Sequence, residues 1–223
     1  MRYENVTPAI FLERPNRFVA RVRIGNSVET VHVKNTGRCR ELLIPDAEVF
    51  LTAPGTAGRK TKYDLIAVRK QSGVLFNIDS QAPNRITREW LEAQGFDRIA
   101  PEYPFGASRI DFYMERAGER YLMEVKGCTL EVDGVGYFPD APTERGVKHI
   151  RELIRAAGEG YHAILAFVVQ MDGVTEVRAH ASMHPEFAEA MEQAINAGVQ
   201  VQIIPCHVEP DACRFCENGS ALT

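Results

Sequence analysis

The feature that most constrains this sequence is a predicted β-hairpin made of the segments SRIDFYME and RYLMEVKG. The turn at residues 116–119 sets the pairing and predicts that Asp111 lies directly opposite Glu124. Directly opposed residues share one face of a sheet, with Cβ atoms about 4.5–5.5 Å apart. Side chains alternate along a strand, so Lys126 lies on the same face as Glu124. The hairpin therefore predicts two carboxylates and a lysine side by side.

Carboxylates held opposite each other repel, so the pair stabilises a fold only if a cation lies between them. Mg²⁺ is an oxygen-seeking ion that one or two carboxylates and a phosphate hold together, and we expect Mg²⁺ or Mn²⁺ here. A lysine two residues beyond the glutamate can contact an attacking water or a phosphate. These parts are the ones that metal-assisted phosphodiester hydrolysis needs. The alternative is a solvated face on which Arg109 and Lys126 pair with the two acids.

A helix is predicted before the hairpin, over NRITREWLEAQG at residues 84–95, with Asn84 as its N-cap. Helical spacing puts Glu89 on the apolar stripe next to Trp90. A carboxylate directed at the interior needs a partner. A metal site is one candidate partner, and an arginine such as Arg88 is the other.

The first part of the chain is rich in strand-like segments. RFVARVRI and VETVHVKN alternate around Gly25-Asn26, which is typical of a hairpin with a type II′ turn. The strand-like segments EVFLTA, YDLIAVRK and VLFNID follow. Several short strands in a segment of this length favour a small barrel of the OB type.

After Pro83 the pattern changes to alternating helices and strands. The helix TERGVKHIRELIRAA begins after Thr143 as N-cap, and HAILAFVV reads as a buried central strand. The order α-β-β-β-α-β-α-β predicts a mixed-sheet α/β domain. We therefore expect a mixed α/β protein with an OB-like barrel over residues 1–82 and an α/β domain over residues 83–223.

Charge is divided unevenly between these two parts. Residues 1–82 carry 13 Lys and Arg against 8 Asp and Glu, whereas the rest of the chain carries 13 against 22. A basic first domain predicts contact with a phosphate backbone, and an unevenly charged solvated surface is the alternative. The cations expected to make this contact are Arg21, Arg23, Lys34, Arg59, Lys60 and Lys62.

Cysteine usage and hydropathy favour a cytoplasmic protein. The five cysteines are an odd number without the spacing of a disulfide framework, so we expect reduced thiols. Zinc held by Cys206, His207, Cys213 and Cys216 is the less favoured alternative. No apolar run approaches the roughly 18 residues that span a bilayer, and the first residues lack the pattern of a secretory signal.

Several segments resemble the SfsA, or sugar fermentation stimulation, family. They are HVKNTGRCRELLIPDAEVFL, NRITREWLE, SRIDFYMER, MEVKGCTL and YFPDAPTERGVKHIREL. The resemblance implies an N-terminal OB-like domain joined to a PD-(D/E)XK nuclease-like domain. It also implies DNA binding and a role in the regulation of sugar utilisation in bacteria.

The same resemblance implies roles for individual residues. It places the nuclease-type acids at Asp111 and Glu124, the lysine at Lys126, and the acidic residue of the preceding helix at Glu89. Lys148 and His149 are expected to border the site. Ile110 stands before Asp111, so the proline of the motif's name is missing, and the loop reads NTGRC where relatives have NTGSM.

Three functions are compatible with these observations. The first is a Mg²⁺- or Mn²⁺-dependent phosphodiesterase that acts on DNA. The second is a DNA-binding regulator that keeps the nuclease scaffold without cleavage. The third is a barrel that binds a small anionic effector. The first requires a bound cation, whereas the second predicts that neutralising Asp111 leaves DNA affinity unchanged or raises it.

Overall fold

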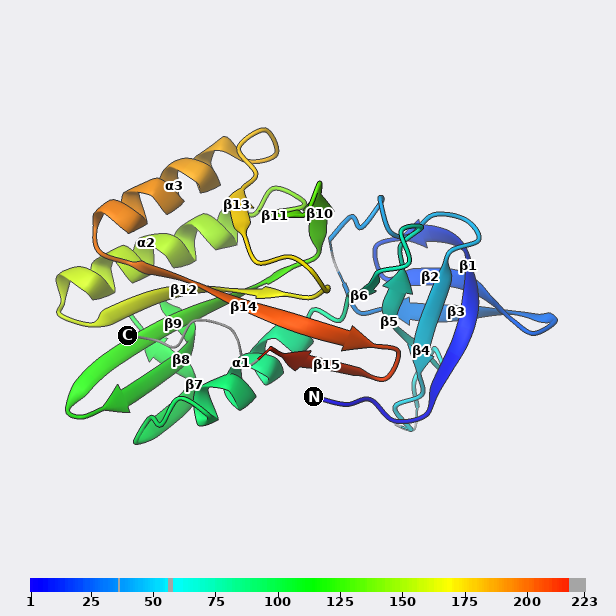
Figure 1. The fold of residues 1–223 in the computed structure, drawn as a ribbon, viewed down its shortest axis with the longest axis horizontal. Coiled ribbons are helices and arrows are strands. Elements are labelled where there is room, and N and C mark those ends of the chain that lie inside the picture. The colour runs from blue at the N-terminus through cyan, green and yellow to red at the C-terminus, as the bar shows by residue number, and fades with distance from the viewer. Residues whose placement is uncertain (36, 56–57, 217–223) are drawn as a thin grey trace.

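The computed structural model describes residues 1–35, 37–55 and 58–216. Figure 1 shows two parts side by side, a β-barrel built from the first strands and a larger domain of helices and sheet. Within the described residues, every helix is too short or too polar to cross a membrane.

The N-terminal part is the predicted OB-type barrel. Its strands follow the order β3-β2-β1-β4-β5-β6, and a parallel pairing between β3 and β5 closes the barrel. The Gly25-Asn26 hairpin is confirmed, with Ala20 opposite Val31 and a positive φ of 56° at Gly25. The strands are β1 (Val6–Asn16), β2 (Val19–Ile24), β3 (Ser27–Val33), β4 (Glu48–Thr52), β5 (Asp64–Arg69) and β6 (Leu75–Asn77).

The C-terminal part is built on a six-stranded mixed sheet of order β15-β14-β12-β9-β8-β7. The central strands β9, β12 and β14 are parallel, and the outer strands pair antiparallel. The strands are β7 (Arg98–Phe105), β8 (Ser108–Arg116), β9 (Glu119–Cys128), β12 (His162–Val169), β14 (Gln200–Glu209) and β15 (Ala212–Phe215). A three-stranded sheet adds β10 (Leu130–Val132), β11 (Val135–Phe138) and β13 (Val177–Ala179).

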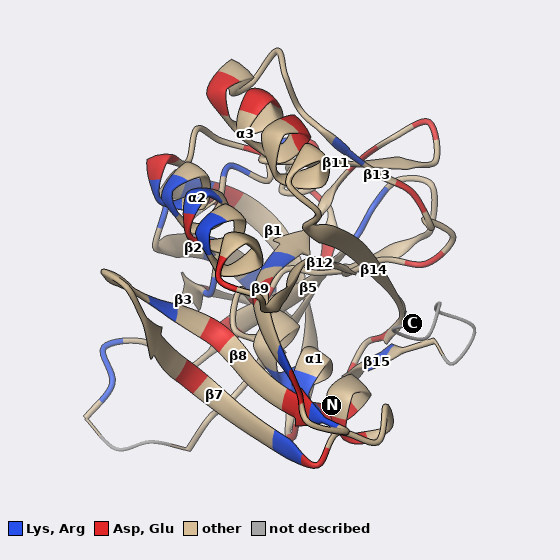
Figure 2. Ribbon diagram, turned by 90° about the vertical axis from the view of Figure 1, so that its left-hand side faces the viewer, with Lys and Arg blue, Asp and Glu red and all other residues tan. Residues whose placement is uncertain are grey.

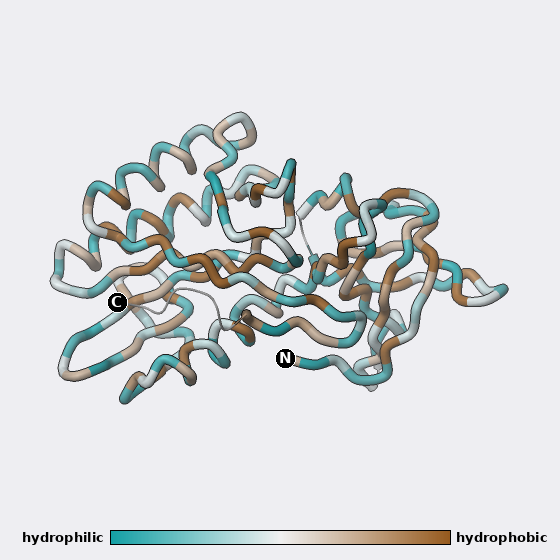
Figure 3. The backbone as a smooth tube through the Cα atoms, viewed as in Figure 1, coloured by the Kyte–Doolittle hydropathy of each residue, from teal (hydrophilic) through white to brown (hydrophobic). Residues whose placement is uncertain are grey.

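Helices cover both faces of the six-stranded sheet. The helices are α1 (Ala82–Glu92), α2 (Glu144–Gly158) and α3 (Pro185–Asn196). α2 and α3 lie on one side of the sheet and α1 on the other (Figure 1, Figure 2). β12 is buried from Ala163 to Val169, as a continuous apolar run between two parallel neighbours must be. Figure 3 shows the hydrophobic residues concentrated along these central strands.

A buried polar network joins the barrel to the sheet. Gln170 donates from Nε2 to Oδ1 of Asn77 at 2.9 Å, and Asn77 donates from Nδ2 to the hydroxyl of Tyr3 at 2.9 Å. Tyr3 in turn donates to Oδ2 of Asp79 at 3.1 Å, and the ammonium of Lys34 reaches the same oxygen at 2.8 Å. These contacts hold the segment between β6 and α1 in place, and this segment leads into the candidate site.

Candidate functional site

The site lies where β8 and β9 separate. Their pairing runs from Arg116–Glu119 to Phe112–Met123, in the predicted register. Beyond that pair, the carboxylate of Asp111 replaces the main chain as the partner of β9, because Oδ2 accepts from the backbone N–H of Val125 at 2.8 Å. The main-chain ladder therefore ends one pair short of Asp111 and Glu124.

Glu124 is the most buried acid of the site, with 2% of its surface exposed. Its Oε1 accepts from Nζ of Lys126 at 2.6 Å and also contacts Nδ1 of His149. Its Oε2 is buried and has no hydrogen-bond partner among the described residues. A buried carboxylate oxygen without a partner is costly, so this atom marks a position where a further group can bind.

The pKa values of the two carboxylates are shifted in opposite directions. Burial and the negative charge of Glu124 raise the pKa of Asp111 above its ordinary value. Burial also acts to raise the pKa of Glu124, but the hydrogen bonds from His149 and Lys126 outweigh it and hold that pKa below its usual range. Glu124 is therefore ionised at neutral pH, and its charge makes a second negative charge on Asp111 unfavourable.

His149 supports Glu124 from the first turns of α2. Thr143 caps this helix as predicted, since its hydroxyl accepts from the N–H of Gly146 at 3.0 Å. Arg145 and His149 are four residues apart and share a face. Arg145 donates from Nε to Nε2 of His149 at 3.2 Å, which assigns the imidazole proton to Nδ1 and makes His149 the donor to Glu124.

These side chains line an open pocket of about 400 Å³. It receives groups from the start of α1, from β8, from β9 and from α2. The polar groups that define it are Asn84, Asp111, Glu124, Lys126, Arg145 and His149. The sequence predicts Asp111, Glu124, Lys126 and His149 at this site, and the structure brings these four together.

The residue that α1 contributes is Asn84 and not the predicted Glu89. Asn84 donates from Nδ2 to Oδ1 of Asp111 at 2.8 Å. Glu89 is exposed, and its carboxylate pairs with the amino nitrogen of Met1 at 2.8 Å. Pro83 fits the first helical turn, where no N–H is needed, so α1 begins at Ala82 and Asn84 is inside it instead of capping it.

Three of the six barrel cations predicted to hold phosphates are engaged in ion pairs. Lys34 pairs with Asp79 at 2.8 Å, Arg59 pairs with Asp64, and Arg21 pairs with Glu13 at 2.9 Å. Lys148, expected beside the pocket, donates instead to the carbonyl of Ala107 at 3.2 Å. Arg23, Lys60 and Lys62 form no ion pair with any residue that the structure describes, and they stay predicted contacts. Figure 2 shows that acidic and basic residues are mixed over α2.

The cysteines do not form a metal centre in the described part of the chain. All five are free thiols. Within that part, no group of three or more His, Cys, Asp or Glu side chains is placed to hold a metal ion.

The fold and the pocket define a two-part protein, in which an OB-type barrel is joined to a mixed-sheet domain with a carboxylate–lysine pocket. Comparison with known families agrees with this division. The family model described as "SfsA N-terminal OB domain" matches residues 12–78, and "Sugar fermentation stimulation protein RE domain" matches residues 81–212. The chain belongs to the SfsA, or sugar fermentation stimulation protein, family.

Similar proteins extend over nearly the whole chain. A sugar fermentation stimulation protein homolog of Desulfitobacterium hafniense is 48% identical over 215 residues, covering 95% of this chain and 94% of that protein. A homolog from Clostridium beijerinckii is 44% identical over 219 residues, covering 96% of each. Among solved structures, "The structure of Pyrococcus Furiosus SfsA in complex with Ca2+" is similar, with a TM-score of 0.86 and 31% identity. The match covers 98% of this chain and 96% of that chain.

Proposed function

We propose that this protein is a divalent-metal-dependent phosphodiesterase that cleaves DNA at the pocket of Asp111, Glu124 and Lys126. The observation that carries the proposal is the buried Oε2 of Glu124, which has no partner among the described residues, beside a second carboxylate. A buried carboxylate whose charge makes ionisation of a neighbouring carboxylate unfavourable is a typical device for holding a cation. We place the activity in the cytoplasm, where free thiols persist.

Asp111 and Glu124 are the residues that would hold Mg²⁺ or Mn²⁺. Their oxygens suit a hard cation that keeps several waters and binds one or two carboxylates together with a phosphate. A similar SfsA protein, from Pyrococcus furiosus, was solved in complex with Ca²⁺, which supports a divalent ion in this family. When bound, the ion supplies positive charge to the phosphate and lowers the pKa of a coordinated water.

The protein side chains supply the remaining parts of the reaction. Asn84 and the N–H of Val125 each donate to one oxygen of Asp111, so this carboxylate is fixed in orientation. Lys126 brings an ammonium group to the pocket, where it orients the attacking water or stabilises charge on the phosphate. Arg145 is exposed at the pocket and uses Nε for His149, which leaves its terminal N–H groups for a phosphate oxygen.

The test is cleavage of labelled single-stranded, duplex and branched DNA with Mg²⁺ or Mn²⁺. We expect products with the wild-type protein and none with EDTA, Asp111→Ala or Lys126→Ala. Cleavage that persists in all three controls would point to a contaminant and contradict the proposal.

The second candidate is a DNA-binding regulator on the same scaffold. It is favoured by the lack of a group of three or more metal-ligating side chains within residues 1–35, 37–55 and 58–216. This candidate predicts that DNA is bound and left uncut, and that Asp111→Ala binds at least as tightly as the wild type. Under either candidate, the names of the relatives associate the protein with sugar utilisation.

A further inference from the structure

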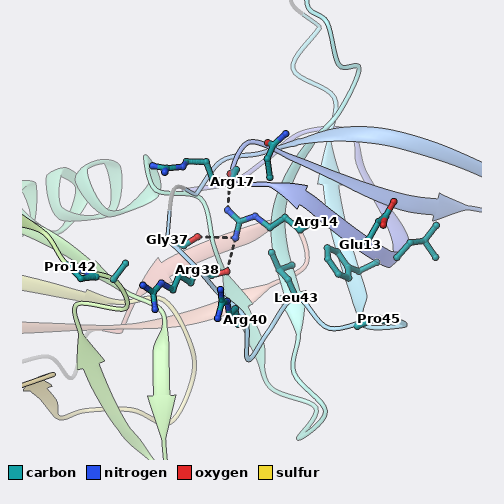
Figure 4. A pocket seen from close by; sticks show the side chains of 13 residues that line it. Glu13, Arg14, Arg17, Gly37, Arg38, Arg40, Leu43, Pro45 and Pro142 are labelled. Atoms are coloured by element: carbon teal, nitrogen blue, oxygen red, sulfur yellow. Dashed lines mark hydrogen bonds between the residues drawn. The ribbon is translucent and has the colours of Figure 1, made fainter. Parts of the chain in front are cut away.

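A second hollow, of about 690 Å³, lies at the junction of the barrel and the C-terminal domain. It lies between the β1–β2 turn, the segment after β3 and residues Ala141 and Pro142 (Figure 4). We call it the arginine groove, because its lining includes Arg14, Arg17, Arg38 and Arg40.

Arg14 holds the groove together. Its Nη1 donates to the carbonyls of Gly37 and Arg38 at 2.9 and 2.8 Å, and its Nη2 donates to the carbonyls of Arg17 and Asn35 at 2.8 and 2.6 Å. One guanidinium thus binds the β1–β2 turn to the segment after β3 (Figure 4). Every one of these acceptors is a neutral carbonyl, so the positive charge of Arg14 is not cancelled.

The other three arginines of the groove present free charge. Arg17, Arg38 and Arg40 are exposed, and their guanidinium groups make no hydrogen bond or ion pair within the described residues. Figure 4 shows Arg38 extended toward Pro142. Glu13 is the acid in the groove lining, and Arg21 already engages it at 2.9 Å. The groove is therefore a concentrated positive surface, unlike the ion-paired Arg21, Lys34 and Arg59 of the barrel.

The arginine groove leads to the carboxylate pocket. A middle hollow of about 360 Å³ shares Arg17, Gly37 and Pro142 with the groove, and it shares Ser80 with the pocket of Glu124. Gly127, the residue after Lys126, lines this middle section. A Cβ on Gly127 would lie 2.4 Å from Oε1 of Gln170, so this position excludes a side chain. The three hollows form one path from the barrel to the two carboxylates.

Phe18 adds an aromatic surface at the barrel end of this path. Its side chain is 54% exposed, which is unusual for a large hydrophobic residue. It is next to Arg17, whose guanidinium carbon lies 5.9 Å from the centre of the ring. Exposed aromatic rings beside arginines stack the bases of single-stranded nucleic acids, and the bases of a duplex are already stacked inside the helix.

We propose that the arginine groove binds the backbone of a single nucleic-acid strand that runs from the carboxylate pocket toward the barrel. Arg17, Arg38 and Arg40 contact successive phosphates, and Phe18 stacks one base. This inference rests on the proposed function, because the strand is the one whose phosphodiester lies at Asp111 and Glu124.

The experiment measures binding of a fluorescent oligothymidylate by anisotropy, over a range of salt concentrations, in EDTA so that nothing is cleaved. The test variant is Arg17→Gln/Arg38→Gln/Arg40→Gln. The charge-matched control is Arg88→Gln/Arg178→Gln/Arg214→Gln, which removes three exposed arginines that pair with glutamates on the C-terminal domain. Circular dichroism and thermal melting establish that both variants are folded.

We expect the groove variant to lose about 2 from the slope of log affinity against log salt, since each phosphate contact on a single strand contributes about 0.7. Its affinity at physiological salt should fall by about ten- to a hundredfold. The control should keep the wild-type slope. Phe18→Ser should keep the slope as well but lower the affinity by about tenfold, because it removes stacking and no charge.

Four results would overturn the inference. Equal losses in the groove and control variants would mean that only net charge matters. Loss with Arg23→Gln/Lys60→Gln/Lys62→Gln but not with the groove variant would move the binding surface to the outer barrel. Duplex DNA bound as tightly as the single strand, with no effect of Phe18→Ser, would exclude the strand-specific path.

Because EDTA is present, a protein that never cleaves DNA can still pass this test. If the groove variant cleaves DNA as fast as the wild type does, this inference fails while the proposed function stands.

Discussion

The barrel and the carboxylate pocket treat buried charge in opposite ways. In the barrel, the buried carboxylates of Asp79 and Asp64 are each matched by a cation, Lys34 and Arg59. In the pocket, the buried Glu124 lies beside the half-buried Asp111, and one oxygen of Glu124 has no partner among the described residues. The contrast lies between these two ion pairs and the pocket, since the barrel also contains Glu41, one oxygen of which is buried without a partner among the described residues.

The difference separates charges that support the fold from charges that are available to a ligand. A matched buried pair holds two segments together, and removing one partner leaves an uncompensated charge. A carboxylate whose pKa is raised, like that of Asp111, lowers stability while it is ionised in the free protein, and a bound cation would offset this cost. The sequence cannot distinguish the two kinds, because both appear as Asp, Glu, Lys and Arg in similar strands.

The most severe test of this contrast is Lys126→Ala. Lys126 is the pocket cation that contacts Glu124, and its loss should lower DNA cleavage by about 10²–10³-fold, as removal of one charge-stabilising donor does. Lys148→Ala removes the same charge from α2, where the ammonium group contacts the carbonyl of Ala107 and lies outside the pocket lining. It should change the rate only a few-fold. Rates measured on one labelled substrate decide the matter, and equal losses would contradict a special role for Lys126.

Lys34→Ala tests the structural side of the contrast. It should destabilise the fold by about 3 kcal/mol, because Asp79 would remain buried and charged without its cation. Arg21→Ala breaks an exposed pair with Glu13 and should cost about 0.5 kcal/mol or less. Urea unfolding of the two variants gives both free energies. If Lys34→Ala were as mild as Arg21→Ala, the buried pair would not support the fold.

His149→Leu probes the group that keeps Glu124 ionised. Without the imidazole donor, only Lys126 is left to offset burial and the pKa of Glu124 rises, so the acidic limb of the pH–rate profile should move to higher pH. Activity at neutral pH should fall by roughly ten- to a hundredfold, as for residues that orient metal ligands. His149→Gln keeps an N–H donor and should recover part of the rate. An acidic limb that stays in place would show that His149 does not control Glu124.

Asp111→Asn should have the smallest effect, a modest increase in Tm of the metal-free protein at neutral pH. The folded-state pKa of Asp111 is raised, so the folded protein favours the protonated form and loses stability as pH rises through that pKa. The asparagine avoids this loss, and the difference in Tm should vanish below the ordinary aspartate pKa of about 3.9. Glu124→Gln should have the opposite sign at neutral pH, because the pKa of Glu124 is lowered. Melting curves in EDTA across pH measure both, and a lower Tm for Asp111→Asn would contradict this account.

The parts of the molecule that were predictable depend on short-range rules. A tight turn sets the register of β8 and β9, so the approach of Asp111 to Glu124 could be derived from the chain alone. Alternating side chains revealed the barrel in the same way. The family resemblance added His149, which the hairpin could not indicate.

The parts that were missed depend on how helices and loops dock. Glu89 stands next to Trp90 in the helix, but the buried stripe of α1 also includes Thr87 and Leu91, which turns Glu89 toward solvent. Asn84 could have been found by noting that Pro83 suits the first turn of a helix. Arg14 gave no local signal, since its four carbonyl partners come from segments that meet only in the folded chain.

The polar network of Tyr3, Asn77, Asp79 and Gln170 has a consequence for cooperativity. The two family models divide this chain between residues 78 and 81, so they describe the barrel and the sheet domain separately. Yet Asn77 is bonded to Gln170 across that division, and Phe76 pairs with Met171. Unfolding of the barrel would remove the hydrogen-bond partner of Gln170, a buried group of the sheet domain. We therefore expect the barrel and the sheet domain to unfold as one unit, although two separate family models match them.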